Sequence, residues 1–77
     1  MVDEEKGDLL IWRIDEDLEF DQLKNIFEDV KYNFDRIIIG ASKSKLKKVI
    51  SSLKLRPLVE KEEGGAMAIL IKPRERN

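Results

Sequence analysis

The sequence predicts an α/β (α+β) fold, a two-layer sandwich with the element order β-α-β-α-β-β, a four-stranded mixed sheet and two helices. Two short runs rich in β-branched residues, 9–14 and 36–40, are each followed by apolar residues at helical spacing. Two further extended runs, 58–62 and 67–71, flank a Gly-Gly pair, which is typical of a hairpin. The 77 residues suffice for one domain. Because each helix has a single apolar stripe, two layers are enough to bury both stripes.

The first run, Leu9 to Ile14, favours a strand because it is short, β-branched and aromatic, and because charged residues flank it. Leu10, Trp12 and Ile14 would share one face of this strand. Leu9 and Ile11 would lie on the other face, which indicates that this second face is partly covered too. We expect Trp12 in the core, the alternative being a platform for a partner subunit on an open sheet face.

A helix is expected at residues 18–32, where apolar side chains recur every three or four positions and would form one face. Asp17 or Asp21 can cap its N-terminus, where acidic residues also suit the helix dipole. The apolar positions are Phe20, Leu23, Phe27, Val30 and Phe34, with Ile26 beside them.

The next two elements are a buried strand and a second helix. Three consecutive isoleucines between Arg36 and Gly40 predict a strand, parallel to the first and joined to it by a right-handed crossover. Ser42 or Ser44 would start the second helix, and Pro57 would set its end. Its apolar stripe consists of Leu46, Val49, Ile50 and Leu53.

The last third of the chain predicts a hairpin in which residues 63–66 form the connection. A type I′ turn at Gly64-Gly65 sets the register, because both central residues of that turn need positive φ. On one face of the hairpin, this register pairs Glu62 with Met67, Glu60 with Ile69 and Leu58 with Ile71. On the other face, it pairs Lys61 with Ala68 and Val59 with Leu70. The face with Leu58, Met67, Ile69 and Ile71 has more apolar volume, so we expect it to meet the helices.

The segment from Arg36 to Pro73 resembles the C-terminal half of the TusA/SirA-like sulfur-carrier family. The shared features are the Ile37-Ile38-Ile39 strand, a short helix, and the turn from Leu58–Glu62 through glycine into Ala68–Lys72. The resemblance implies the same β-α-β-α-β-β order. That family carries sulfur on a cysteine of a Cys-Pro-x-Pro motif that opens the first helix, whereas Asp15–Asp21 contains neither Cys nor Pro. A persulfide needs a thiolate, so the resemblance implies a member without sulfur relay.

The composition argues against catalysis and against a bound metal or other cofactor. The chain has no Cys and no His, which removes the usual general base, the thiol nucleophile and the common zinc ligands. It also lacks a Gly-x-Ser-x-Gly elbow and a Walker loop. Acidic residues gather between Asp15 and Asp21, where a strand meets a helix N-terminus, so capping and solvation are expected in preference to a divalent cation site.

Charge and hydropathy predict a cytoplasmic protein without a membrane span. No stretch approaches about 20 apolar residues, and the charged N-terminus is no secretory signal. Residues 1–8 and 74–77 are expected to be a disordered leader and tail around a single domain at 9–73. Charged residues make up 40% of the chain, while Asn and Gln are rare, a composition typical of thermophile proteins.

Charge is strongly segregated along the sequence. Residues 15–35 contain eight acids against two bases, and residues 36–56 contain seven bases and no acid. If both helices lie on one sheet face, an acidic helix beside a basic one would compensate locally through exposed ion pairs.

The functional interpretation of the same pattern is a basic surface on the second helix, suited to phosphates or to an acidic protein. A narrower version is an anion site at the turn from Gly40 to Lys45, built from backbone N–H groups at a strand end and a helix start. The candidate anion or nucleic-acid contacts are Ser42, Lys43, Ser44, Lys45, Lys47, Lys48 and Lys54.

The sequence therefore favours a non-catalytic binding module that acts through protein–protein association. The partner would be a second copy in a homodimer or a subunit of a larger assembly, because a domain this small has a thin core. The free sheet face and the hairpin edge are the candidate surfaces. The alternatives are a nucleic-acid-binding accessory protein using the basic helix, disfavoured by the acidic overall balance, and an anion sensor at the Gly40–Lys45 turn.

Overall fold

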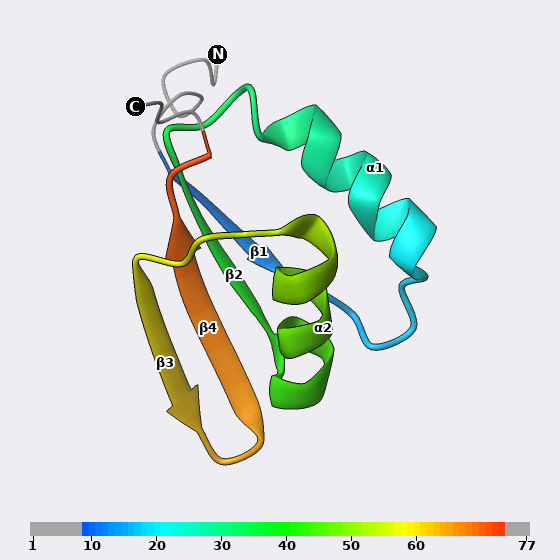
Figure 1. Cartoon of the computed structure of the whole chain (residues 1–77), viewed down its shortest axis with the longest axis vertical. Helices are drawn as coiled ribbons and strands as arrows, with labels where there is room; N and C mark the ends of the chain where they lie inside the picture. Colours follow the sequence, from blue (N-terminus) through cyan, green and yellow to red (C-terminus); the bar gives the residue numbers. More distant parts are fainter. Residues whose placement is uncertain (1–8, 74–77) are drawn as a thin grey trace.

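The computed structural model describes residues 9–73, in which four strands and two helices follow one another as the sequence predicts (Figure 1). The leader and tail expected at 1–8 and 74–77 lie outside the described residues. The elements are β1 (Leu9–Arg13), α1 (Phe20–Val30), β2 (Arg36–Ser42), α2 (Lys43–Leu53), β3 (Val59–Glu63) and β4 (Ala66–Ile71).

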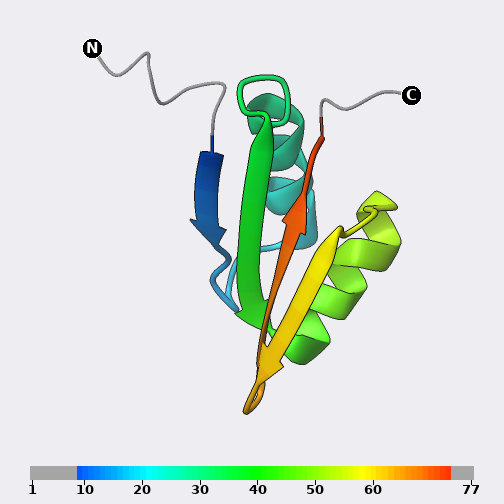
Figure 2. The same ribbon diagram turned by 90° about the vertical axis from the view of Figure 1, so that its left-hand side faces the viewer.

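The four strands form one mixed sheet in the order β1-β2-β4-β3. β1 runs parallel to β2, while β4 is antiparallel to both β2 and β3. Both helices cover the same face of this sheet and leave the other face open (Figure 2). The two-layer β-α-β-α-β-β fold is therefore confirmed, and the structure decides which face the helices cover.

The core lies between the helices and the sheet. Met67, Ile69 and Ile71 are buried there, so the expectation that this face of β4 meets the helices is confirmed. Leu58 was expected beside them but remains 56% exposed, because it precedes β3 at the outer edge of the sheet. The buried apolar residues are Ile14, Leu23, Phe27, Ile37, Ile39, Leu46, Val49, Met67, Ile69 and Ile71.

Helix α1 is shorter than the predicted span of 18–32. Its N-cap is Glu19, not Asp17 or Asp21, and the side chain of Gln22 accepts a hydrogen bond from the Glu19 backbone N–H at 3.2 Å. Glu19 and Gln22 form a capping box around the first turn, which makes an aspartate cap unnecessary.

Strand β2 continues two residues past Gly40, so the strand predicted to end at that glycine was placed too short. Helix α2 begins directly after it, with Ser42 as the N-cap whose Oγ accepts a hydrogen bond from the Lys45 N–H at 3.3 Å. The helix ends at a left-handed Lys54 (φ 56°), where the Leu55 N–H donates to the Ile50 carbonyl at 3.0 Å. This C-cap closes the helix three residues before Pro57.

The hairpin has the predicted register, with Val59 opposite Leu70 and Lys61 opposite Ala68. Its two-residue loop is Gly64-Gly65, but only Gly64 has a positive φ, 64°. The predicted type I′ turn needs positive φ at both residues and is therefore wrong, whereas positive φ at the first residue alone fits a type II′ turn. Both turn types join two strands with the same pairing, so the register is unaffected.

Candidate functional site

The open face of the sheet carries a row of apolar side chains that crosses all four strands. Ile11 of β1 lies opposite Ile38 of β2, Ile38 lies opposite Leu70 of β4, and Leu70 lies opposite Val59 of β3. Side chains of a strand alternate between faces, and the neighbours Ile37, Ile39 and Ile69 are buried under the helices. These four residues, the apolar row, therefore point away from the helices, over about 14 Å at the usual strand spacing.

Exposure within the apolar row increases toward its ends. Ile11 is 70% exposed and Val59 is 49% exposed, while Ile38 and Leu70 are half-buried by their neighbours. The prediction that this face of the first strand is at least partly covered agrees with the half-buried Leu9 but is wrong for Ile11. A contiguous exposed apolar surface of this kind is what protein contact sites offer, whereas isolated surface apolar residues need no explanation.

A second row on the same face has small residues at its centre and cations at its ends. Arg13 lies opposite Gly40, Gly40 opposite Ala68, and Ala68 opposite Lys61. β1 ends at Arg13 while β2 continues to Ser42, so the surface is hollowed beside the end of β1. This shallow hollow of about 540 Å³ lies at the end of the sheet and is lined from both of its sides, by Gly40 of the open face and by Met67 of the helix side. Arg13 lies in its lining beside the acidic residues Asp15 and Glu16. The open face thus combines an apolar band with charged residues at its rim, the usual anatomy of a contact surface.

Trp12 does not belong to the open face. It lies opposite Ile39, which is buried under the helices, and it packs half-buried against the core. The expectation of a core position is met, and the alternative of a platform on the open face is wrong.

The predicted anion site at Gly40 to Lys45 has no turn, because β2 runs through Gly40 to Ser42 and passes directly into α2. Ser42 caps the helix. The Lys43 N–H donates to the Gly65 carbonyl at 2.8 Å, and its ammonium pairs with Glu62 at 3.1 Å. Ser42 therefore stabilises the first turn of α2, and Lys43 attaches the start of this helix to the hairpin.

Lys45 also acts within the fold. Its ammonium donates hydrogen bonds to the carbonyl oxygens of Glu16 at 3.1 Å and Leu18 at 2.7 Å, in the loop between β1 and α1. The basic and the acidic segment of the sequence therefore meet here, through backbone carbonyls and not through carboxylates.

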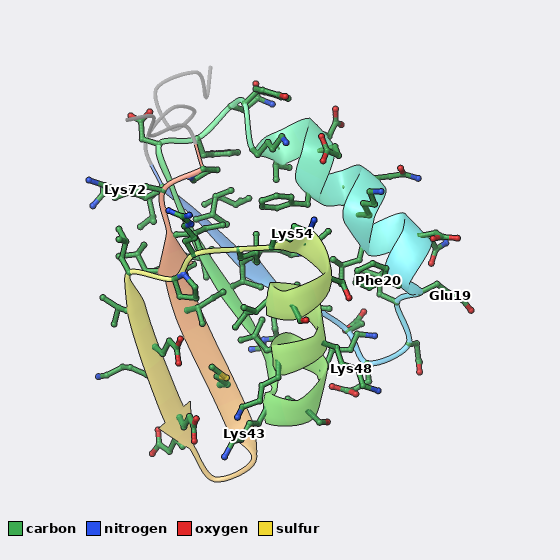
Figure 3. The ribbon with its side chains drawn as sticks, in the orientation of Figure 1. Glu19, Phe20, Lys43, Lys48, Lys54 and Lys72 are labelled. Carbon is green, nitrogen blue, oxygen red and sulfur yellow. The ribbon has the colours of Figure 1, made fainter. Side chains whose placement is uncertain are left out.

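The other candidate contacts are exposed but spread apart. Ser44, Lys47, Lys48 and Lys54 are all exposed. Lys43, Lys48 and Lys54 lie at the start, middle and end of α2 and do not converge on one point (Figure 3). They offer a loosely cationic helix surface and no enclosed anion site.

The expected ion pairs between the two helices are not formed. Within residues 9–73 no ion pair joins α1 to α2; Lys31 pairs with Glu28 inside α1 at 3.1 Å, and Lys43 pairs with the hairpin. The Glu28 carboxylate raises the pKa of Lys31 by hydrogen bonding to its ammonium. In the described part of the chain, no three potential metal-ligating side chains of His, Cys, Asp or Glu gather at one place.

Comparisons with known proteins identified no relative that shares this site. No family model, no curated protein and no solved structure matches the chain. The resemblance to the TusA/SirA-like family therefore stays a prediction. No helix within residues 9–73 is both long and apolar enough to cross a membrane.

The sequence predicted the free sheet face as a contact surface but did not predict which residues form the apolar row, although the hairpin register already paired Val59 with Leu70. The missing information was the pairing of β2 with β4, which no local pattern encodes. The one available signal was the presence of apolar residues on both faces of residues 9–11 and 37–39.

Proposed function

We propose that the protein is a non-catalytic interaction module that binds a protein partner through the open face of its sheet. The observation that supports this function is the apolar row Ile11–Ile38–Leu70–Val59, which lies in register across the whole sheet and is exposed at both ends. Burial of such a surface is favourable by about 25 cal/mol per Å² of apolar area. Arg13 and Lys61 beside the row would face acidic groups of the partner, while Glu63, on the same face of β3 as Lys61, would face a basic one.

The second observation in favour of this function concerns the basic residues that the sequence offered as anion contacts. Ser42, Lys43 and Lys45 already bind groups of their own chain, so the second helix offers a phosphate fewer free donors than its sequence indicates. A contact that depends on apolar area is also less sensitive to salt than a phosphate contact.

The test uses one substitution on each layer of the molecule. Ala68→Glu places a carboxylate at the centre of the open face, where Lys61 opposite it keeps the cross-strand pair favourable. Ser51→Glu makes the same charge change on the exposed side of α2. The wild-type chain and both variants are immobilised, and proteins retained from a lysate of the source cells are compared at low and high salt.

We expect a partner that the wild-type chain and Ser51→Glu retain at both salt concentrations and that Ala68→Glu loses. Equal retention by all three chains would contradict a contact on the open face. Retention of nucleic acid that decreases with salt, and that Lys47→Glu with Lys48→Glu abolishes, would support the nucleic-acid alternative instead.

A further inference from the structure

The two edges of the sheet differ sharply in their protection. Edge strand β3, Val59–Glu63, is exposed at every position and has four charged residues in a row after Val59. Charged side chains are a common device against pairing with another sheet. Edge strand β1, Leu9–Arg13, has one charged residue, at its last position. The edge of β1 is therefore the one that can accept another strand.

We propose that two copies of the chain associate by antiparallel pairing of their β1 strands around a two-fold axis at Ile11. The product is a continuous eight-stranded sheet whose helices all lie on one side. This inference goes beyond the proposed face contact and does not depend on it, because it uses the backbone groups of the β1 edge. The hairpin edge, which the sequence offered as a candidate surface, takes no part.

The backbone of β1 presents the groups that this pairing needs. The Ile14 N–H donates to the Gly40 carbonyl at 2.8 Å, toward β2. Backbone groups alternate in direction along a strand, so those of Leu10 and Trp12 also face β2, while those of Leu9, Ile11 and Arg13 face outward. No described strand lies on that outer side. Three residues spaced by two match one side of an antiparallel ladder and allow about six hydrogen bonds between the copies.

The side chains are self-complementary in this register. Ile11 is the middle residue of β1, so it faces Ile11 of the second copy, and Leu9 faces Arg13. The apolar row would then continue through the axis into the same row of the second copy, which covers its most exposed member. On the helix side Leu10 would face the half-buried Trp12. The two Arg13 residues would stand about 14 Å apart, so their charges do not oppose the pairing.

Disulfide trapping tests the register, because the natural chain contains no cysteine. Ile11→Cys places two thiols on opposite residues of a hydrogen-bonded pair, whose Cα atoms are about 5.5 Å apart and within disulfide range. Val59→Cys is the matched control at the other end of the same row. With oxidised glutathione we expect Ile11→Cys to form covalent dimers about tenfold faster or more, since pairing raises the effective concentration of its thiols.

A mixture of Leu9→Cys and Arg13→Cys chains should also form mixed dimers, whereas Arg13→Cys alone should not. Equal rates for Ile11→Cys and Val59→Cys, or dimers of Arg13→Cys alone, would overturn the proposed register.

Sedimentation equilibrium of the full chain tests the association itself. The wild-type chain should approach twice its monomer mass as concentration increases. Ile11→Lys, which places two ammonium groups opposite each other at the axis, should remain a monomer, while Val59→Lys should still dimerise. A monomeric wild-type chain at all concentrations, or a dimeric Ile11→Lys, would contradict the proposal.

Ala68→Glu distinguishes the edge contact from the face contact of the proposed function. This variant should lose the face contact but still form the dimer. A monomeric Ala68→Glu would show that the dimer forms through the open face instead.

Discussion

At the scale of single residues, Lys45 shows how a cation can serve the fold instead of a ligand. Its ammonium donates to the carbonyl oxygens of Glu16 and Leu18, and so ties the loop before α1 to the first turn of α2. Lys45→Met keeps the aliphatic stem and removes the donors. We expect this substitution to lower the free energy of unfolding by about 1 kcal/mol, as measured by urea denaturation, because hydrogen bonds from a charged group are lost at a partly exposed site.

The control is Lys47→Met, two residues further along the same helix. Lys47 is exposed and makes no hydrogen bond or ion pair with residues 9–73, so its loss should change the free energy of unfolding by less than about 0.5 kcal/mol. If both variants unfold at the same urea concentration as the wild-type chain, the two carbonyl contacts of Lys45 contribute nothing measurable.

At the scale of elements, the hairpin depends on one backbone conformation. Gly64 has a φ of 64°, a region that costs a residue with a side chain about 1 kcal/mol or more, whereas Gly65 does not have a positive φ. A Cβ at either position would meet no atom within 4 Å, so sterics with the rest of the fold do not separate the two sites. Thermal denaturation should therefore show a clear loss of stability for Gly64→Ala and a much smaller effect for Gly65→Ala. Equal losses would mean that the conformation of Gly64 is not what limits the turn.

At the scale of the whole molecule, stability should be linked to association. A small domain with ten buried apolar residues between positions 9 and 73 has a modest core, and anything that binds only the folded chain adds to its stability. If β1 pairs with its copy, the thermal midpoint of the wild-type chain should increase with protein concentration, while that of Ile11→Lys should not. A differential scanning calorimetry series over a hundredfold range of concentration, chosen so that mass action changes the dimer fraction, checks this. A concentration-independent midpoint for both chains would contradict a folded-state dimer.

Local sequence patterns were enough to predict the elements and their order, because both follow from local physics. Apolar spacing marked Leu23 and Phe27 for one helix and Leu46 and Val49 for the other, and all four are buried. The Gly-Gly pair set the hairpin register, although the turn type was wrong, since registers depend on loop length more than on the φ of one residue. The predicted helix boundary was wrong where another residue caps the helix, as Glu19 does at the start of α1.

The surfaces on which function is proposed depend on contacts between distant parts of the chain. The strand order placed Ile11, Ile38, Leu70 and Val59 in one row, although they come from four segments spread over most of the described chain. Conversely, the residues that resembled an anion site in the sequence bind groups of their own chain. Ser42 caps α2, Lys43 pairs with the hairpin, and Lys45 donates to the loop before α1. Local patterns state which side chains alternate on a strand. They do not state which strand lies beside it or which face the helices cover, because those depend on contacts between residues far apart in the chain.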